Sequence, residues 1–349
     1  MKKEIIFVGW INKGKTADCG ETMKNQLCIK KLEEYGIHCR QIDFKNWKKH
    51  PWVIVQLIGN MIIHKDDTLI LSTSPKNVYP LIVILKIIKW KQNIVLWVIG
   101  GSFGQKVQQK IYRSDVLGLV KHILVESSIM VQQLEACGVN GVIEVPNFKP
   151  IHYYPFTDKK YPLNKQPLRF VFLGRIIPEK GCDYILQAAR LLNYLGYKDR
   201  YKIDFYGKIA ENYNEKFYKK VNALCNVNYC GFLDLTNREG YNTLASYDLM
   251  LFPTYWKGEG FAGVFIDAFI AGVPIIATDW AHNKIFLQEG KTALFVPVHN
   301  VSDLAEKMKN CIDGKVNIHD MSLQCQNEAK KYDINNVITE KLLKRIEVL

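Results

Sequence analysis

The chain has 349 residues, of which 48% are apolar and 23% charged, and this globular mixture excludes disordered, collagen-like and low-complexity proteins. The length favours two domains over one or three. The unusual feature is the charge, because 47 lysines and arginines stand against 34 aspartates and glutamates, a net +13. That excess predicts an anionic partner: a nucleic acid, a phosphate-bearing ligand or an acidic membrane surface.

The cysteines and the apolar runs indicate a cytoplasmic protein that does not cross a membrane. Nine scattered cysteines without a Cys-x-x-Cys pair favour buried free thiols over structural zinc. The first apolar run, 4–9, is too short for a signal peptide and is predicted to form a buried strand. The longest apolar stretch, 78–99, is interrupted by Lys86, Lys89 and Lys91, so it is not expected to span a bilayer.

Short apolar runs alternate with helical patterns along the chain, which is typical of βαβ units and parallel sheets. Each half is therefore predicted to form its own doubly wound sheet, in an N-terminal domain at 1–150 and a C-terminal domain at 169–333 joined by a proline-rich linker at 151–168. The predicted strands are 4–9, 37–43, 68–72, 93–99, 121–125 and 142–145, then 169–174, 202–206, 227–230, 248–252, 273–278 and 292–296.

Amphipathic helices fit between these strands. The helix predicted at 21–35 places Met23 and Leu27 inward and Lys24 outward. Another helix follows Gly181, and a final helix at 334–349 is expected to pack back on the N-terminal domain.

The sharpest motif lies between Leu173 and Gly181, where a predicted strand ends and a helix begins. Ligands of open α/β sheets bind at that position, and Arg175 and Lys180 lie close enough in sequence to converge on a diphosphate. A solvated loop is the structural alternative.

A second motif runs from Gly258 to Pro274, where small residues lead into a helix. Glu259 precedes this helix and Asp267 lies within it. Free amides at a helix start bind phosphate or hydroxyl oxygens, and carboxylates accept hydrogen bonds from sugar hydroxyls. The structural alternative is that Asp267 only complements the helix dipole.

Together the two motifs resemble the C-terminal half of family 4 glycosyltransferases of the GT-B class. The resemblance rests, in order, on Gly174-Arg175, Lys180-Gly181, Glu259, Asp267, and Ala271-Gly272 with Pro274, and it covers residues 169–310. It implies two Rossmann-like doubly wound domains that face each other across a cleft, with the nucleotide sugar in the second domain and the acceptor in the first.

The resemblance also implies roles for individual residues. Arg175 and Lys180 would stabilise the leaving nucleoside diphosphate, Glu259 would contact the donor sugar, and Asp267 would hold the ribose. Similar enzymes retain the anomeric configuration and need no metal or other cofactor. The remaining residues expected to bind the donor, several of them through backbone amides, are Gly14, Gly100, Gly101, Gly174, Phe261, Ala262 and Gly263.

Two departures from the family pattern stand out. Asp267 occupies a position where glutamate is usual, so its side chain is one methylene shorter. The segment from Trp97 to Ser102 has no histidine where the family often has one facing the sugar, and the backbone of Gly100 or Gly101 is expected to take that place. No histidines have metal-ligand spacing, and the acidic pair Asp66-Asp67 is predicted to be solvated.

The positive charge is concentrated in the first domain. Residues 1–150 contain 21 basic and 12 acidic residues, whereas the remainder contains 26 and 22. The segments 45–58 and 80–91 combine tryptophan, apolar residues and lysines as interfacial helices do, although 80–91 fits a buried helix equally well. These segments predict peripheral binding to an anionic leaflet at the inner face of the plasma membrane.

The sequence therefore predicts a retaining glycosyltransferase that moves a sugar from a UDP- or GDP-sugar to a glycan or a lipid-linked oligosaccharide in cell-surface polysaccharide biosynthesis. A GT-B-like nucleotide-sugar epimerase or phosphorylase is the alternative. A nucleic-acid-binding protein is disfavoured because no zinc finger or RNA-binding aromatic motif accompanies the charge.

Overall fold

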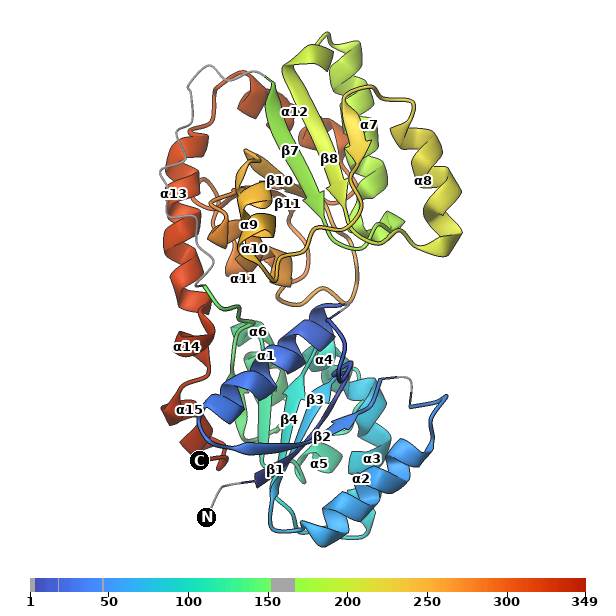
Figure 1. Ribbon diagram of the computed structural model, residues 1–349, viewed down its shortest axis with the longest axis vertical. Coiled ribbons are helices and arrows are strands. Elements are labelled where there is room, and N and C mark those ends of the chain that lie inside the picture. The colour runs from blue at the N-terminus through green and yellow to red at the C-terminus, as the bar shows by residue number, and fades with distance from the viewer. Residues whose placement is uncertain (1–3, 18, 46, 152–166) are drawn as a thin grey trace. The chain divides into compact units, whose positions relative to one another are not determined.

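The computed structural model describes residues 4–17, 19–45, 47–151 and 167–349 (Figure 1). The chain divides into two compact units: unit 1 is Met1–Lys149 with Ile334–Leu349, and unit 2 is Pro150–Asp333. The linker predicted at 151–168 lies almost entirely outside the described residues. Each unit contains one six-stranded sheet, and all twelve predicted strands are confirmed.

The sheet of unit 1 is parallel throughout, with the strand order β2-β1-β3-β4-β5-β6. Its central strands are continuous apolar runs because both faces are covered. Alternate side chains face opposite layers, so Ile6 and Val8 join one core cluster and Ile5 and Phe7 the other. The strands are β1 (Glu4–Gly9), β2 (His38–Asp43), β3 (Thr68–Thr73), β4 (Ile94–Val98), β5 (His122–Val125) and β6 (Val142–Glu144).

Helices cover both faces of this sheet. One face packs against α1 (Gly20–Glu34), α14 (Ile334–Val337) and α15 (Glu340–Arg345). The other face packs against α2 (Trp52–Ile63), α3 (Pro75–Ile87), α4 (Phe103–Gln108), α5 (Ser114–Leu117) and α6 (Ser128–Glu135).

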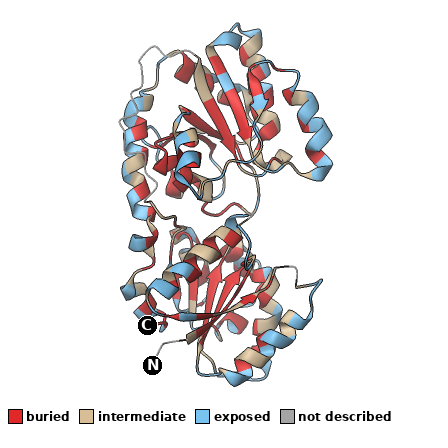
Figure 2. Cartoon of the chain, in the orientation of Figure 1, coloured by how far each residue is buried: buried red, intermediate tan, exposed pale blue. Residues whose placement is uncertain are grey.

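Unit 2 repeats this architecture with a parallel sheet in the order β12-β11-β10-β7-β8-β9. Its strands are mostly buried, as the red in their arrows in Figure 2 shows. They are β7 (Leu168–Leu173), β8 (Tyr201–Tyr206), β9 (Val227–Tyr229), β10 (Leu249–Phe252), β11 (Ile275–Thr278) and β12 (Ala293–Val296).

Two layers of helices enclose the second sheet as well. One layer contains α7 (Cys182–Tyr194), α8 (Asn214–Val221) and α12 (Val301–Ile312). The other contains α9 (Arg238–Ala245), α10 (Gly263–Ile270), α11 (Asn283–Phe286) and α13 (Ile318–Ala329). The predicted fold class of two doubly wound parallel sheets is therefore confirmed.

Three local predictions need correction. Lys24, predicted to point outward, is buried because its ammonium pairs with Glu126 at 2.7 Å. The single helix predicted at 334–349 is two helices, and Thr339 caps the second by accepting a hydrogen bond from the amide of Leu342. The nine cysteines are free thiols, but Cys19, Cys225 and Cys230 are exposed.

The C-terminal segment packs on α1 within unit 1. The hydroxyl of Tyr35 donates to the carbonyl of Ile338 at 3.2 Å, and Lys31 donates to Asn335 at 2.7 Å. Among the described helices, none combines the length and the apolar character that crossing a bilayer requires.

Candidate functional site

The candidate site of unit 2 lies where the strand order of its sheet reverses. From β7 the chain continues to β8 on one side, and from β10 it continues to β11 on the other. The carboxyl ends of β7 and β10 are neighbours, and ligands of doubly wound sheets bind at such a switch point. The loops that follow these strands carry Arg175, Lys180 and Glu259.

Glycines allow the loop after β7 to approach its neighbours closely. Gly181 has a φ of +79°, and a Cβ there would lie 2.1 Å from the carbonyl oxygen of Pro253 at the end of β10. A Cβ on Gly207 would lie 1.8 Å from the carbonyl oxygen of Gly174. Gly207 and Gly181 therefore allow these two close approaches because neither residue carries a Cβ.

Hydrogen bonds connect the loops that follow β7, β10 and β11. The amide of Tyr255 donates to the carbonyl of Glu179 at 2.8 Å, and the indole of Trp280 donates to the carbonyl of Trp256 at 2.9 Å. Thr278 donates through its hydroxyl to the carbonyl of Thr254 at 2.5 Å. The loops after β7, β10 and β11 therefore form one connected surface.

Lys180 and Glu259 form an ion pair inside this surface. The Nζ of Lys180 lies 2.9 and 2.7 Å from the two carboxylate oxygens of Glu259, and the side chains are only 12% and 7% exposed. The hydroxyl of Thr254 also donates to Glu259 at 2.8 Å. The structure therefore brings together two of the three residues predicted to be catalytic.

Arg175, the third of these residues, is exposed. Its guanidinium carbon lies 5.3 Å from the ring centroid of Trp256, a cation–π contact that orients the side chain. Within the described part of the chain, no carboxylate forms an ion pair with Arg175, so its donors face solvent. A planar fork of donors held in this way suits a phosphate oxygen.

The predicted amide donors lie at the start of α10. Ala262 precedes this helix and Gly263 is its first residue, so the amides of these two residues have no acceptor within the helix. The ring of Phe261 stacks on that of Phe286 at 3.9 Å inside the core. Phe261 therefore offers a ligand its backbone, while its side chain fixes the start of the helix.

Asp267 lies further along α10 and is 3% exposed. Its carboxylate accepts a hydrogen bond from the hydroxyl of Tyr241 on α9 at 2.7 Å. That bond orients the carboxylate and ties α9 to α10.

The predicted donor residues of unit 1 occupy two places. Gly14 lies in an exposed turn after β1 with a φ of +75° and lines a hollow of about 560 Å³ together with Lys13, Lys15 and Lys30. Gly100 and Gly101 follow β4, where Gly100 has a φ of +109° and the amide of Ile99 donates to Thr73 at 3.3 Å.

Sequence reasoning missed a polar cluster at the switch point of unit 1, between the carboxyl ends of β1 and β3. Thr73 donates to the carboxylate of Glu21 at 2.6 Å and accepts from Asn77 at 3.0 Å. Burial raises the pKa of Glu21 to about 7, against the opposing effects of the Thr73 hydrogen bond and the charges of Lys76 and Lys24.

Beside this cluster, buried polar groups hold the strand ends together. Lys24 and Glu126 form an ion pair under the rings of Trp97 and Phe148, and Ser72 donates to Asn25 at 2.6 Å. The available signal was the position of Ser72, Thr73 and Glu126 directly at strand ends, where polar residues interrupt apolar runs.

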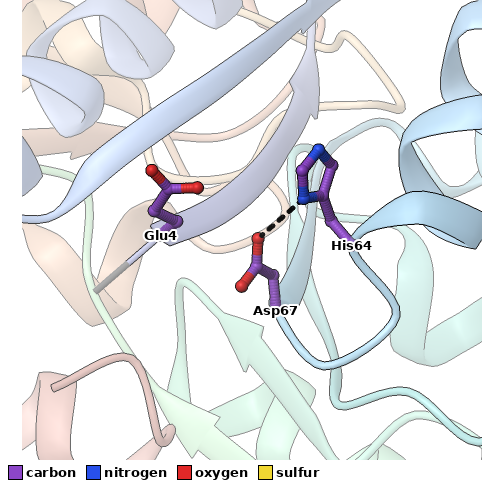
Figure 3. Close-up of side chains that lie close together, drawn as sticks. All are labelled: Glu4, His64 and Asp67. Carbon is purple, nitrogen blue, oxygen red and sulfur yellow. Dashed lines mark ion pairs between the residues drawn. The ribbon is translucent and has the colours of Figure 1, made fainter. Parts of the chain in front are cut away.

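One group of three potential metal ligands occurs among the described residues: Glu4, His64 and Asp67, whose ligand atoms lie within 4.8 Å of one another (Figure 3). Arg40 pairs with Glu4, and its Nε lies 3.8 Å from Asp67. The guanidinium already pairs with both carboxylates, and the group lies at the amino ends of β1 and β3, away from the switch point. Asp67, predicted to be solvated, is a half-buried partner of Arg40.

Comparisons with known proteins relate the chain to sugar-transferring enzymes. The family model described as glycosyl transferases group 1 matches residues 154–332. An uncharacterized 41.2 kDa protein in the cps region of Klebsiella pneumoniae is 27% identical over 146 residues, which are 42% of this chain. The match spans only 37% of that relative's length.

Solved structures share the fold along the whole chain. Alr3699/HepE of Anabaena in complex with UDP-glucose matches with a TM-score of 0.71 at 13% identity, covering 99% of this chain and 100% of that one. Sucrose-phosphate synthase from Thermosynechococcus elongatus matches with a TM-score of 0.76 at 13% identity, covering 99% and 98%. The lipopolysaccharide outer core galactosyltransferase WaaB matches with a TM-score of 0.70 at 14% identity, covering 99% and 100%. The fold class is thus that of GT-B proteins.

Proposed function

The chain belongs to the glycosyl transferases group 1 family, and on that premise we propose that it is a retaining glycosyltransferase using a UDP- or GDP-sugar. The observation that carries the proposal is the Lys180–Glu259 pair beside Arg175 and the start of α10, at the switch point of unit 2. UDP is the first candidate, because the Anabaena protein of this fold was solved with UDP-glucose.

The residues of unit 2 suit the parts of such a donor. Arg175 and Lys180 bind the diphosphate, whose negative charge increases as the bond to the sugar breaks. The amides of Ala262 and Gly263 donate to phosphate or sugar oxygens with the help of the helix dipole. Glu259 accepts hydrogen bonds from sugar hydroxyls, and Asp267, oriented by Tyr241, accepts them from the ribose.

In the proposed reaction, the bond between the anomeric carbon and the diphosphate oxygen breaks, and a bond to an acceptor hydroxyl oxygen forms. The diphosphate leaves with the bonding electron pair, and its leaving oxygen takes the proton that the acceptor hydroxyl gives up. Two side-chain cations can supply the charge stabilisation that a metal would otherwise give. The donor contacts of Gly14, Gly100 and Gly101 stay predictions.

The acceptor is proposed to be a glycan or a lipid-linked oligosaccharide in cell-surface polysaccharide synthesis, at the cytoplasmic face of the plasma membrane. The relative in the cps region of Klebsiella pneumoniae supports this setting. The excess of basic residues in the first 150 positions supports an anionic membrane as a partner.

The proposal is tested by incubating the protein with UDP- and GDP-sugars and candidate acceptors while following release of the nucleoside diphosphate. Release should require Arg175 and Lys180 but not Lys219, an exposed lysine of α8. An isomerised nucleotide sugar would instead indicate an epimerase. A sugar phosphate formed with inorganic phosphate would indicate a phosphorylase.

A further inference from the structure

The outer surface formed by α2 and α3, here called the α2–α3 face, is apolar. Of the twelve residues of α2, only Leu57 and Met61 are buried. Ile63 at the end of α2 is 75% exposed and Ile87 at the end of α3 is 73% exposed. The other large apolar side chains exposed on the two helices and directly after α3 are Trp52, Val55, Ile58, Ile62, Ile84 and Ile88.

A groove separates the two helices, which lie side by side (Figure 1). Its volume is about 400 Å³, and fourteen of its sixteen lining residues are apolar. Ile58 and Ile62 of α2 and Ile84 of α3 both line the groove and reach solvent. Isolated exposed apolar residues are ordinary, but a continuous apolar patch marks an interaction site.

Lysines lie on α3 and in the segments directly before and after the two helices. From Phe44 to Lys91 the sequence has eight lysines and only two carboxylates, Asp66 and Asp67. Neither α2 nor α3 contains an acidic residue, and Asp67 lies near Arg40 and His64. Lys48, Lys86 and Lys91 are exposed. The surface therefore combines an apolar centre with a cationic border.

We propose that the α2–α3 face docks on an anionic phospholipid leaflet, with its exposed apolar side chains among the acyl chains and one acyl chain in the groove. An acyl chain is apolar like the lining of the groove, and anionic headgroups carry the charge opposite to that of the lysines. Each helix is too short to span a bilayer, since twelve residues of α2 extend about 18 Å against a hydrocarbon core of about 30 Å. The helices therefore lie in the plane of the membrane surface.

This inference deepens the proposed function by placing its membrane partner on named elements. Vesicle binding requires no sugar transfer, so failure of either proposal is observed separately. A chain that binds vesicles without releasing nucleotide would overturn only the glycosyltransferase, and an active chain that ignores vesicles would overturn only the docking.

The test is flotation of the full chain with phosphatidylcholine vesicles, with and without phosphatidylglycerol. Binding should require the anionic lipid and should weaken when salt rises from about 0.1 M to about 1 M, since the Debye length falls from ~10 to ~3 Å. Equal binding to both vesicle types, or no binding to either, would overturn the proposal.

Matched variants distinguish binding through the α2–α3 face from non-specific binding through other exposed apolar residues. Ile63→Glu with Ile87→Glu should lower vesicle partitioning more than about tenfold, because both charges would enter the hydrocarbon boundary. Tyr194→Glu with Leu195→Glu, two exposed positions at the end of α7, should leave it unchanged. Both pairs alter exposed side chains, and circular dichroism checks that each variant folds.

The lysines are tested in the same way. Lys86→Gln with Lys91→Gln should lower vesicle partitioning about 25-fold, because each positive charge lost near an anionic surface lowers it about fivefold. Lys216→Gln with Lys219→Gln, exposed lysines of α8, is the control. Equal losses of vesicle partitioning in the two double variants would show that binding depends on the total charge of the chain and not on the α2–α3 face. Concentration-dependent dimerisation abolished by the isoleucine variants would assign the face to a second copy and overturn the docking.

Discussion

The ammonium of Lys180 lies within 2.9 Å of both carboxylate oxygens of Glu259, so the residue assigned to the diphosphate neutralises the residue assigned to the sugar. Sequence reasoning treats the two as separate ligands of one donor. In the folded chain they form one ion pair, so a diphosphate bound as proposed would compete with Glu259 for the same ammonium. Nucleotide binding should therefore alter the ion pair on which local stability depends.

Lys180→Ala and Glu259→Ala should each abolish most transfer. Each should also cost the fold about 3 kcal/mol, because either change leaves a buried charge without its partner. The double variant should lose less stability than the sum of the single losses. Urea unfolding of the four proteins measures this coupling, and strictly additive losses would contradict the ion pair.

Arg175→Ala should lower the rate of transfer about a hundredfold without lowering stability, since Arg175 is exposed and only its cation–π contact with Trp256 is lost. Arg175→Lys keeps the charge but not the planar fork, so it should restore only part of the rate. Nucleotide release and thermal unfolding of both variants check this. Full activity of Arg175→Ala would show that Arg175 has no role in the proposed donor site.

Gly181→Ala should weaken nucleotide binding and destabilise the chain, because the new Cβ would lie 2.1 Å from the carbonyl oxygen of Pro253. Gly196→Ala is the matched control, since Gly196 has a similar φ of +84° with no atom within 4 Å of its Cβ. The control should lose about 1 kcal/mol from backbone conformation alone. Equal losses of stability in the two variants would refute the packing argument.

Glu21 should make the stability of the chain depend on pH. Because its pKa is raised from 4.5 to about 7 on folding, the folded state binds more protons than the unfolded state between these values. Stability therefore falls as pH rises through this window, by on the order of 3 kcal/mol.

Replacement by glutamine removes this effect, so Glu21→Gln should gain stability relative to the wild type as pH rises from 5 to about 8. Urea unfolding at a series of pH values measures the difference. A constant difference across the series would mean that Glu21 ionises normally in the folded chain.

The fold was predictable because its strands are continuous apolar runs that only a covered parallel sheet can bury. The loop around Arg175 and Lys180 was predictable because glycines and cations follow the end of a strand. Local patterns could not predict the inward position of Lys24, since its partner Glu126 lies 102 residues away. The cluster of Glu21 and Thr73 likewise depends on the strand order that makes β1 and β3 neighbours.

The account is tested most directly by thermal unfolding in the presence of a panel of nucleoside diphosphates and their sugars. A uridine or guanosine diphosphate should stabilise the chain, by about 2.7 kcal/mol at a hundred times its Kd, and Arg175→Ala should lose most of that stabilisation. A chain that no nucleoside diphosphate stabilises, or one whose stabilisation survives in Arg175→Ala, would contradict the proposed donor site.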